Sequence, residues 1–313
     1  MTLAFTFPGQ GSQSVGMGKD LANAFAAARS VFEEIDDALS QNLSRLMWEG
    51  PMDELTLTAN TQPALMACSL AVMRVLKQDF DVDVSAASYV AGHSLGEYSA
   101  LCAAGSLSLA ETALLLRLRG EAMQKAVPVG AGAMAALLGA DLDVANQAVA
   151  AGAKSGICQI ANDNAVGQVV ISGAKAAVEA AIEAANELGV RKAVLLPVSA
   201  PFHCELMAPA AEAMADALAD IDLKTPLVPV VNNVTAQAVS CPEQLKSDLI
   251  TQVTGRVRWR ESVTWMAKNQ VETFAEPGTG KVLTGMLRRI VKGVNGIALN
   301  TPEALEKFAK TLT

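Results

Sequence analysis

The segment from residue 87 to about residue 103 constrains the fold most strongly. A short apolar run, residues 87–91, leads into Gly92-His93-Ser94-Leu95-Gly96, and a helical stretch follows. A chain that passes so quickly from strand to helix must turn very tightly, and glycine at both ends of the turn avoids a Cβ clash. Such a turn exposes the serine hydroxyl close to backbone N–H groups at the start of the helix. The segment predicts a strand–turn–helix unit with a nucleophilic Ser94, and the alternative is an ordinary strand–helix turn.

The same alternation of short apolar runs and helical stretches continues along the chain. Residues 3–7 form an apolar run that ends at Pro8-Gly9, which predicts a buried first strand. Pro63 suits the first position of a helix. This order predicts an α/β fold with a mainly parallel sheet. The expected helices are 18–40, 63–78 and 108–126, and the expected later strands of the core are 228–231 and 273–276.

Residues 131–199 follow a different rhythm, which reads strand, helix, strand, strand, helix, strand. This βαββαβ order is the split pattern of a ferredoxin-like unit. We therefore expect a catalytic core, residues 1–130 and 200–313, interrupted by a ferredoxin-like subdomain, residues 131–199. A chain of 313 residues is long enough for both. The expected strands are 133–138, 157–161, 168–172 and 193–198, and the expected helices are 142–151 and 174–188.

Composition excludes several classes of protein. The formal net charge is −8 and no run is rich in lysine or arginine, so a nucleic-acid partner is not expected. No apolar run is long enough to span a bilayer, and the N-terminus shows no basic leader, so we expect a soluble cytoplasmic protein without a membrane partner. The cysteines lack a C-x-x-C spacing, which favours reduced thiols over disulfides or a metal site. They are Cys68, Cys102, Cys158, Cys204 and Cys241.

A serine hydroxyl needs a base, and the chain offers two histidines. His93 adjoins Ser94, so its side chain should point away from the hydroxyl. His203 follows the return from the inserted segment, where a loop can reach across a cleft, and we predict that it is the base. The alternative for His203 is a surface-loop histidine. No Asp or Glu stands out as a third member of a triad.

Two glycine-rich segments do not match the nucleotide-binding motifs that they resemble. The segment that begins at Gly9 lacks the third glycine of a dinucleotide fingerprint, and the segment 275–282 lacks the first glycine and the Ser/Thr of a phosphate loop. The first loop can still place Gln10 at the carboxyl end of the sheet, where α/β sites form.

Arg117 and Arg119 flank the apolar stripe of one helix on opposite sides, and periodicity cannot choose between them. At least one should have a buried partner, a structural salt bridge being the alternative to a binding role.

Six blocks, in order along the whole chain, resemble the malonyl-CoA:acyl-carrier-protein transacylase family. The blocks span residues 7–13, 60–65, 92–98, 119–124, 231–234 and 276–278. The resemblance implies an α/β-hydrolase-like core with a ferredoxin-like subdomain. It implies that Ser94 is the nucleophile and His203 the base. It also implies an oxyanion hole formed by the side chain or backbone of Gln10 and the backbone N–H of Leu95.

The resemblance further assigns substrate-reading residues. By its Arg-Gly context Arg119 is expected to bind the malonyl carboxylate, and Gln252 is expected to orient His203 through its main-chain carbonyl. Phe202 stands where many stand-alone members carry a small polar residue, and phenylalanine there accompanies malonyl selection in synthase domains. The implied reaction is ping-pong transfer from malonyl-CoA to the phosphopantetheine thiol of acyl carrier protein, which supplies malonyl-carrier protein for fatty acid synthesis without a metal or resident cofactor.

Two other functions remain open from the residues alone. One is a serine esterase or thioesterase, which would not need Arg119, and the other is a non-catalytic module that docks carrier proteins. Because carrier proteins are acidic and this chain is acidic, docking needs a local basic patch. The candidates are Lys281, Arg288, Arg289 and Lys292, for which the alternative is a solvated helix face.

Overall fold

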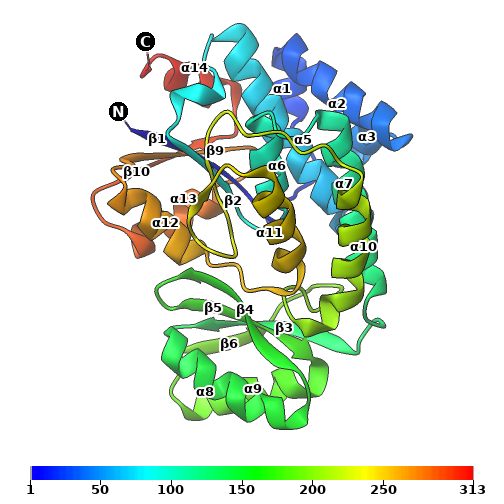
Figure 1. The fold of residues 1–313 in the computed structure, drawn as a ribbon, viewed down its shortest axis with the longest axis vertical. Coiled ribbons are helices and arrows are strands. Elements are labelled where there is room, and N and C mark those ends of the chain that lie inside the picture. Colours follow the sequence, from blue (N-terminus) through cyan, green and yellow to red (C-terminus); the bar gives the residue numbers. More distant parts are fainter. Residues whose placement is uncertain (1, 313) are drawn as a thin grey trace.

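A six-stranded sheet lies at the centre of the larger body of this computed structural model, which describes residues 2–312 (Figure 1). Its order is β10-β9-β1-β2-β7-β8, parallel from β10 to β7, with β8 antiparallel at the edge. The four inner strands are almost entirely buried because helices cover both faces of the sheet, whereas the edge strands are partly exposed. The strands are β1 (Leu3–Phe7), β2 (Tyr89–Gly92), β7 (Val230–Val231), β8 (Ala238–Val239), β9 (Thr273–Pro277) and β10 (Asn295–Leu299).

Alternate residues of β1 face two different helical layers. Phe5 and Phe7 belong to the larger apolar cluster, whereas Ala4 belongs to a smaller cluster built on Trp259 and Met286. The layer with the larger cluster contains α1 (Lys19–Ala24), α2 (Ala26–Leu39), α3 (Leu43–Glu49), α4 (Met52–Thr56), α5 (Thr58–Asp79), α6 (Leu95–Ala103), α7 (Leu109–Lys125), α10 (Ala208–Ala219), α11 (Pro242–Thr254) and α14 (Pro302–Ala309). The opposite layer contains α12 (Trp259–Lys268) and α13 (Val282–Ile290). Three single-turn 3₁₀ helices complete the regular structure, at Val84–Ala86, Ala153–Ser155 and Glu205–Met207.

Two predicted helices differ from the observed ones. The expected helix 18–40 is broken at Phe25, whose backbone is extended (φ −127°, ψ 126°), so that α1 and α2 are separate. The expected helix 63–78 begins earlier, at Thr58, and Pro63 lies inside it. Proline cannot donate a helical hydrogen bond, so Pro63 removes one bond from α5, and the nearly complete burial of this helix outweighs that loss.

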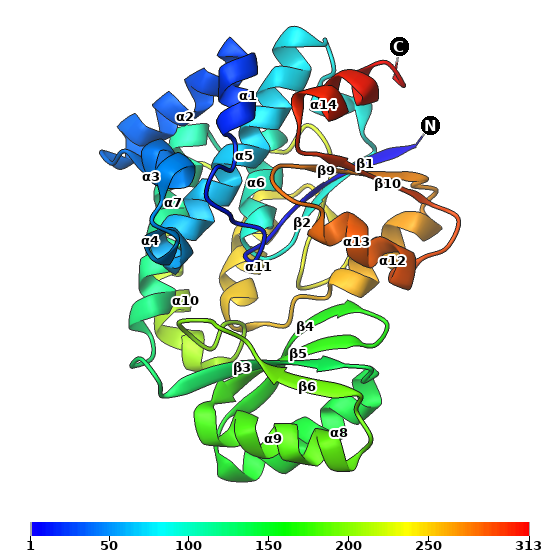
Figure 2. The ribbon, with the colours of Figure 1, turned by 180° about the vertical axis from the view of Figure 1, so that it is seen from behind.

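The inserted segment folds into a separate four-stranded antiparallel sheet, order β4-β5-β3-β6. Its helices cover the face that is turned away from the larger body, as both views show (Figures 1 and 2). The βαββαβ prediction is confirmed, except that the second strand is longer than expected and the last one ends at Leu195 rather than at residue 198. The elements are β3 (Gly132–Leu138), α8 (Leu142–Gly152), β4 (Cys158–Ala165), β5 (Gln168–Ala174), α9 (Lys175–Glu187) and β6 (Lys192–Leu195). We propose the subdomain boundaries expected from the sequence, residues 131 and 199.

The end of β4 joins the subdomain to the core. Asp163 N–H donates to the Val257 carbonyl at 2.9 Å, and Val257 N–H donates to the Ala161 carbonyl at 2.8 Å. The Asp163 carboxylate, whose side chain is 1% exposed, accepts two parallel hydrogen bonds from Arg260 at 2.9 and 2.8 Å. The subdomain is therefore held next to residues 255–258, the loop that follows α11.

No helix within residues 2–312 is long and apolar enough to cross a membrane.

Candidate active site

Ser94 sits on a strained turn between β2 and α6. Its backbone has a positive φ of 53° with ψ −111°, a conformation that L-residues adopt only when the surroundings impose it. A Cβ on Gly92 would lie 1.8 Å from the Gly96 carbonyl carbon, and a Cβ on Gly96 would lie 2.2 Å from the Phe7 oxygen. Both glycines are required for β1, β2 and α6 to approach so closely, which is what the sequence predicted for this turn.

Asn233 holds this turn from the neighbouring strand end. The Ser94 N–H donates to Asn233 Oδ1 at 2.7 Å, and Asn233 Nδ2 donates to the Gly92 carbonyl at 2.6 Å. The Asn233 side chain is fully buried. The sequence placed Asn233 in a motif but gave it no role. Its position two residues after the end of β7, at the carboxyl edge of the sheet, is the signal that could have found it.

His203 meets Ser94 from the loop that returns from the subdomain. Its Nε2 lies 2.7 Å from Ser94 Oγ, and its Nδ1 lies 2.9 Å from the Gln252 carbonyl and 3.1 Å from the Gly255 carbonyl. Because carbonyl oxygens only accept, Nδ1 carries the proton and Nε2 is free to accept the serine proton. Both carbonyls lie at the C-terminal end of α11, where helical donors run out. Backbone carbonyls thus stand where a triad has a carboxylate.

The environment keeps the His203 imidazole neutral. Burial is the main cause and the positive charge of Arg119 the second, and together they lower the His203 pKa to about 3. A neutral imidazole is the form that accepts a proton from a hydroxyl. His93, the other histidine, points elsewhere, with Nε2 2.7 Å from Asn164 Oδ1 of β4. The structure therefore brings Ser94 to His203 and not to His93, as predicted.

Arg119 is 1% exposed, and the acceptors of its guanidinium hydrogen bonds are neutral. Nη1 donates to Gln62 Oε1 at 2.9 Å, and Nη2 donates to Gln252 Oε1 at 2.8 Å and to Ser94 Oγ at 3.1 Å. Within the described chain no carboxylate forms an ion pair with it. A buried cation without a paired anion is costly, so this position favours an anionic ligand.

Gly120 explains why Arg119 rather than Arg117 enters the site. A Cβ on Gly120 would lie 2.6 Å from the Thr58 oxygen, so glycine lets α7 approach the start of α5, the helix that carries Gln62. Arg117 lies on the other side of α7, half-buried, and donates to Asn60 Oδ1 at 2.8 Å and also to Gln41. The buried partners expected for one arginine are therefore amides, and neither arginine forms a salt bridge among the described residues.

Glu97 is the buried group that the sequence reasoning missed. It lies on α6, one turn after Ser94, and its carboxylate accepts from Gln252 Nε2 at 2.9 Å and from Asn233 N–H at 3.0 Å. Burial raises the Glu97 pKa to about 7. A residue three positions after a nucleophile on a helix faces the same side, which is the signal that could have drawn attention to it.

Ser94, His203 and Arg119 border one cleft between the core and the subdomain, with a volume of about 530 Å³. Leu95 is the first residue of α6, so its N–H has no helical acceptor and is available to an anion. Gln10 lines the same cleft from the loop after β1, beside Ser94 and His203. The other lining residues are Gly11, Gln13, Met52, Thr56, Gln62, His93, Arg119, Met123, Met134, Asn162, Asn164, Val170, Leu196, Pro197, Val198 and Phe202.

Comparison with known proteins agrees with this geometry. The acyl transferase domain family matches residues 4–301. The chain is 45% identical to the malonyl CoA-acyl carrier protein transacylase of Bacillus subtilis over 99% of its own length and 97% of that protein. The chain belongs to the acyl transferase domain family.

Solved structures of similar proteins have the same fold. The acyl-carrier-protein-S-malonyltransferase of Bartonella henselae superposes with a TM-score of 0.98 at 56% identity, covering 100% of this chain and 99% of that one. A malonyl-transacylase in complex with its type II PKS acyl-carrier protein superposes with a TM-score of 0.96 at 41% identity, covering 99% and 100%. The expected α/β fold class is therefore confirmed, and so is the family resemblance.

The basic patch expected on this acyl transferase lies on α13 and its flanks. Arg288, Arg289, Lys281 and Lys292 are all exposed. Arg289 reaches the subdomain, where it donates to Gln168 Oε1 of β5 at 2.6 Å. Through Arg289 the patch reaches the border between core and subdomain. Helix α13, which carries it, lies beside α12 on one side of the central sheet (Figure 2). Among residues 2–312 we find no cluster of three or more His, Cys, Asp or Glu residues placed to hold a metal ion.

Proposed function

We propose that this acyl transferase moves the malonyl group of malonyl-CoA to the phosphopantetheine thiol of acyl carrier protein, through an ester on Ser94, and so supplies malonyl units for fatty acid synthesis. The observation that carries the proposal is the Arg119 guanidinium, which is buried beside Ser94 Oγ at 3.1 Å and has only neutral partners. Malonyl-CoA brings a carboxylate on a thioester, which matches one cation beside one nucleophile. The Bacillus subtilis relative is named for malonyl-CoA and acyl carrier protein, and the Bartonella henselae one for malonyl transfer to acyl carrier protein, which supports the same assignment.

The first half-reaction begins with proton transfer from Ser94 Oγ to His203 Nε2. The serine oxygen attacks the thioester carbonyl carbon, and a tetrahedral oxyanion forms. We assign its stabilisation to the N–H of Leu95 and to Gln10, which border the cleft on the side of the turn. The C–S bond then breaks, and the proton held on His203 passes to the sulfur of coenzyme A.

The second half-reaction repeats these steps with another thiol. The phosphopantetheine thiol gives its proton to His203, attacks the malonyl ester, and leaves Ser94 protonated again. Every step is proton transfer or nucleophilic substitution, so Ser94 and His203 account for the chemistry without a metal or resident cofactor. Coenzyme A and phosphopantetheine enter as parts of the substrate and of the carrier.

Arg119 gives the enzyme its selectivity in this account. A carboxylate placed in an apolar cleft is costly unless a cation meets it, and a guanidinium can meet it with two parallel hydrogen bonds. The hydrogen bonds of Arg119 to Gln62 and Gln252 hold the guanidinium ready for this contact before substrate arrives. Gln252 serves twice, because its backbone carbonyl also orients His203.

The deciding experiment separates transfer from hydrolysis. The enzyme is mixed with malonyl-CoA and holo acyl carrier protein, and the products are malonyl-carrier protein or free malonate. We expect a burst of coenzyme A equal to the enzyme concentration, followed by malonyl-carrier protein. Steady release of malonate at the same rate with and without carrier protein would identify a thioesterase instead.

We also propose that the protein works in the cytoplasm. All five cysteines are free in the structure, and only Cys241 is exposed, which fits a reducing compartment. Labelling the folded protein with a thiol reagent should modify Cys241 first.

A further inference from the structure

Glu97 has a buried carboxyl group that the mechanism above does not use. Its Oε2 accepts two hydrogen bonds, from Gln252 Nε2 at 2.9 Å and from the Asn233 N–H at 3.0 Å, whereas its Oε1 has no partner. The side chain is fully buried. Burial of a carboxyl group with one unpartnered oxygen opposes folding, so a role confined to stability does not explain why the carboxyl is there.

The carboxylate dictates which way the Gln252 amide faces. Glu97 Oε2 accepts a hydrogen bond from the Asn233 N–H, which can only donate, so the same oxygen meets the amide as an acceptor and faces its NH₂ end. The carbonyl end, Gln252 Oε1, is then turned toward Arg119 Nη2 at 2.8 Å. If the amide were reversed, its NH₂ would face the guanidinium, and two donors would oppose each other. Gln252 Nε2 also donates to the Ser94 carbonyl at 3.1 Å, which supports the same orientation.

We propose that Glu97 is a positioning residue that fixes the side-chain amide of Gln252 and thereby holds the Arg119 guanidinium in the orientation that reads the acyl carboxylate. The proposal rests on the function proposed above. It separates the two duties of Gln252. The backbone carbonyl that orients His203 does not move when the amide turns, so loss of Glu97 should disturb selectivity more than the chemistry at Ser94.

The test compares variants of Glu97 and Gln252 by single-turnover acylation of Ser94 with malonyl-CoA and with acetyl-CoA. Glu97→Met keeps the bulk of the side chain and removes the acceptor. We expect its malonyl-to-acetyl rate ratio to fall about 10- to 100-fold, the loss expected for a hydrogen bond to a charged group. Glu97→Gln keeps one carbonyl oxygen that can accept both hydrogen bonds, so its ratio should stay within about threefold of the parent.

Gln252→Met removes the amide through which Glu97 is proposed to act on Arg119, and it leaves Glu97 unchanged. It removes the amide and keeps the backbone carbonyl at His203, so it should lower the ratio as Glu97→Met does. The double variant should be no worse than Gln252→Met alone, because Glu97 acts through that amide. The exposed Glu212 on α10 provides the matched control, and Glu212→Met should leave both rates unchanged.

The two proposals fail in different ways. Equal loss of malonyl and acetyl acylation in Glu97→Met, or a retained ratio in Gln252→Met, would overturn the positioning role while the function stands. If Glu97→Met does not fold, the ratio in Gln252→Met still decides. A parent enzyme that forms no malonyl-Ser94 ester would overturn the function itself.

Discussion

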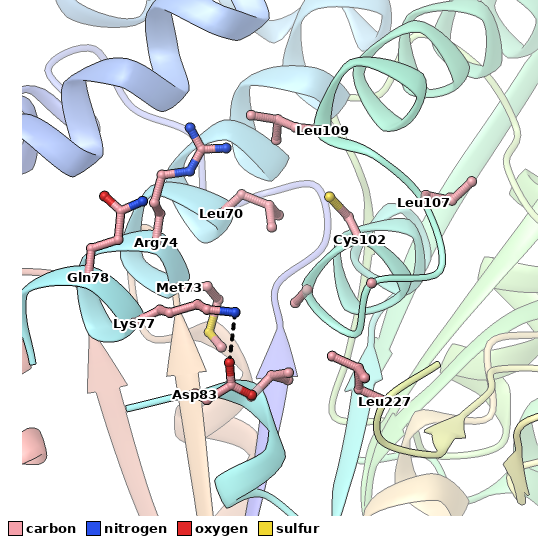
Figure 3. Close-up of a pocket in the computed structure, with 13 residues that line it drawn as sticks. Leu70, Met73, Arg74, Lys77, Gln78, Asp83, Cys102, Leu107, Leu109 and Leu227 are labelled. Carbon is pink, nitrogen blue, oxygen red and sulfur yellow. Dashed lines mark ion pairs between the residues drawn. The ribbon is translucent and has the colours of Figure 1, made fainter. Parts of the chain in front are cut away.

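Two hollows in this molecule contain arginine or lysine beside apolar side chains. In one hollow these cations form ion pairs with carboxylates, and in the other the cation does not. The groove in Figure 3, about 310 Å³, is bordered by Arg74 and Lys77. Arg74 Nη1 lies 2.9 Å from Glu34 Oε2, and Lys77 Nζ lies 2.9 Å from Asp83 Oδ2, so each cation is already paired with a carboxylate. In the catalytic cleft Arg119 is buried and has only amide and hydroxyl acceptors. The absence of a directly bonded carboxylate at Arg119, and not the presence of a hollow or of positive charge, distinguishes the proposed binding site.

The nucleophile gives the largest expected difference between the two hollows. Ser94→Ala should fold normally and lose transfer activity by about 10⁶-fold, as nucleophile deletions do in other serine enzymes. The groove holds a nucleophilic atom too, the thiol of Cys102, but burial raises its pKa to about 12, so it stays protonated. Cys102→Ala should leave the rate unchanged in the same malonyl transfer assay. Retention of more than a few per cent of activity in Ser94→Ala would rule out the covalent mechanism.

The unpaired arginine gives the next largest effect. Arg119→Ala would leave the malonyl carboxylate buried without its cation, which costs about 3–5 kcal/mol, or on the order of 10²–10³ in kcat/KM. Acetyl-CoA has no carboxylate, so its reaction should be spared, and Arg119→Lys should recover only part of the malonyl rate. Arg74→Ala in the groove and Arg117→Ala on α7 should change selectivity little. Steady-state rates with both thioesters would show whether Arg119 reads the substrate or, if both fall equally, only supports the fold.

Glu97 and Asp83 should give opposite dependences of stability on pH. Burial raises the Glu97 pKa from 4.5 to about 7. As pH rises, the carboxyl group therefore loses its proton at a lower pH in the unfolded chain than in the folded one. Its contribution to the free energy of unfolding is therefore present below pH 4.5 and is lost as pH rises to about 7, on the order of 3 kcal/mol. Hydrogen bonds from Ser85 and Lys77 lower the Asp83 pKa to about 2, so its contribution is lost only as pH falls below 4.

Urea unfolding of the parent, Glu97→Gln and Asp83→Asn at several pH values measures these contributions as differences. The parent should lose stability relative to Glu97→Gln between pH 4.5 and 7, and relative to Asp83→Asn only near pH 2–4. A parent–Glu97→Gln difference that does not change with pH would mean that the Glu97 pKa is the same in the folded and unfolded states, and a difference that rises with pH would mean that folding lowers it.

The basic patch on α13 should give the smallest effect. Rim charges alter association more than chemistry, so reversing Arg288 and Arg289 to Glu should raise the KM for acyl carrier protein about three- to tenfold. Formation of the malonyl ester with malonyl-CoA should not change, because the patch is absent from the residues that line the cleft. Equal damage to both half-reactions would show that the patch is not a docking surface.

The sequence predicted the elements of this fold better than their contacts. The strand–turn–helix at Ser94 and the βαββαβ order could be predicted because each is a local pattern of apolar runs and glycines. The start of α5 was not, because tertiary burial carried the helix past Pro63. Arg117 and Arg119 were equivalent by periodicity, and only the close approach at Gly120 separates them.

The buried polar contacts could not be predicted from the residues alone. Gln252 meets Ser94 and Glu97 across more than 150 positions of sequence, and Asn233 meets Ser94 across 139. Such contacts have no periodicity, since they depend on which strand ends the topology brings to one edge of the sheet. The family resemblance gave Gln252 a role, but it gave none to Glu97 or Asn233, although both lie in its blocks.

The most direct test of this account is the mass of the intact protein after brief exposure to equal concentrations of malonyl-CoA and acetyl-CoA. We predict that the parent gains one malonyl group, that Arg119→Ala gains acetyl at the expense of malonyl, and that Ser94→Ala gains neither. An adduct that persists in Ser94→Ala, or a parent that takes up malonyl and acetyl equally, would contradict the claim that one serine and one unpaired arginine define this site.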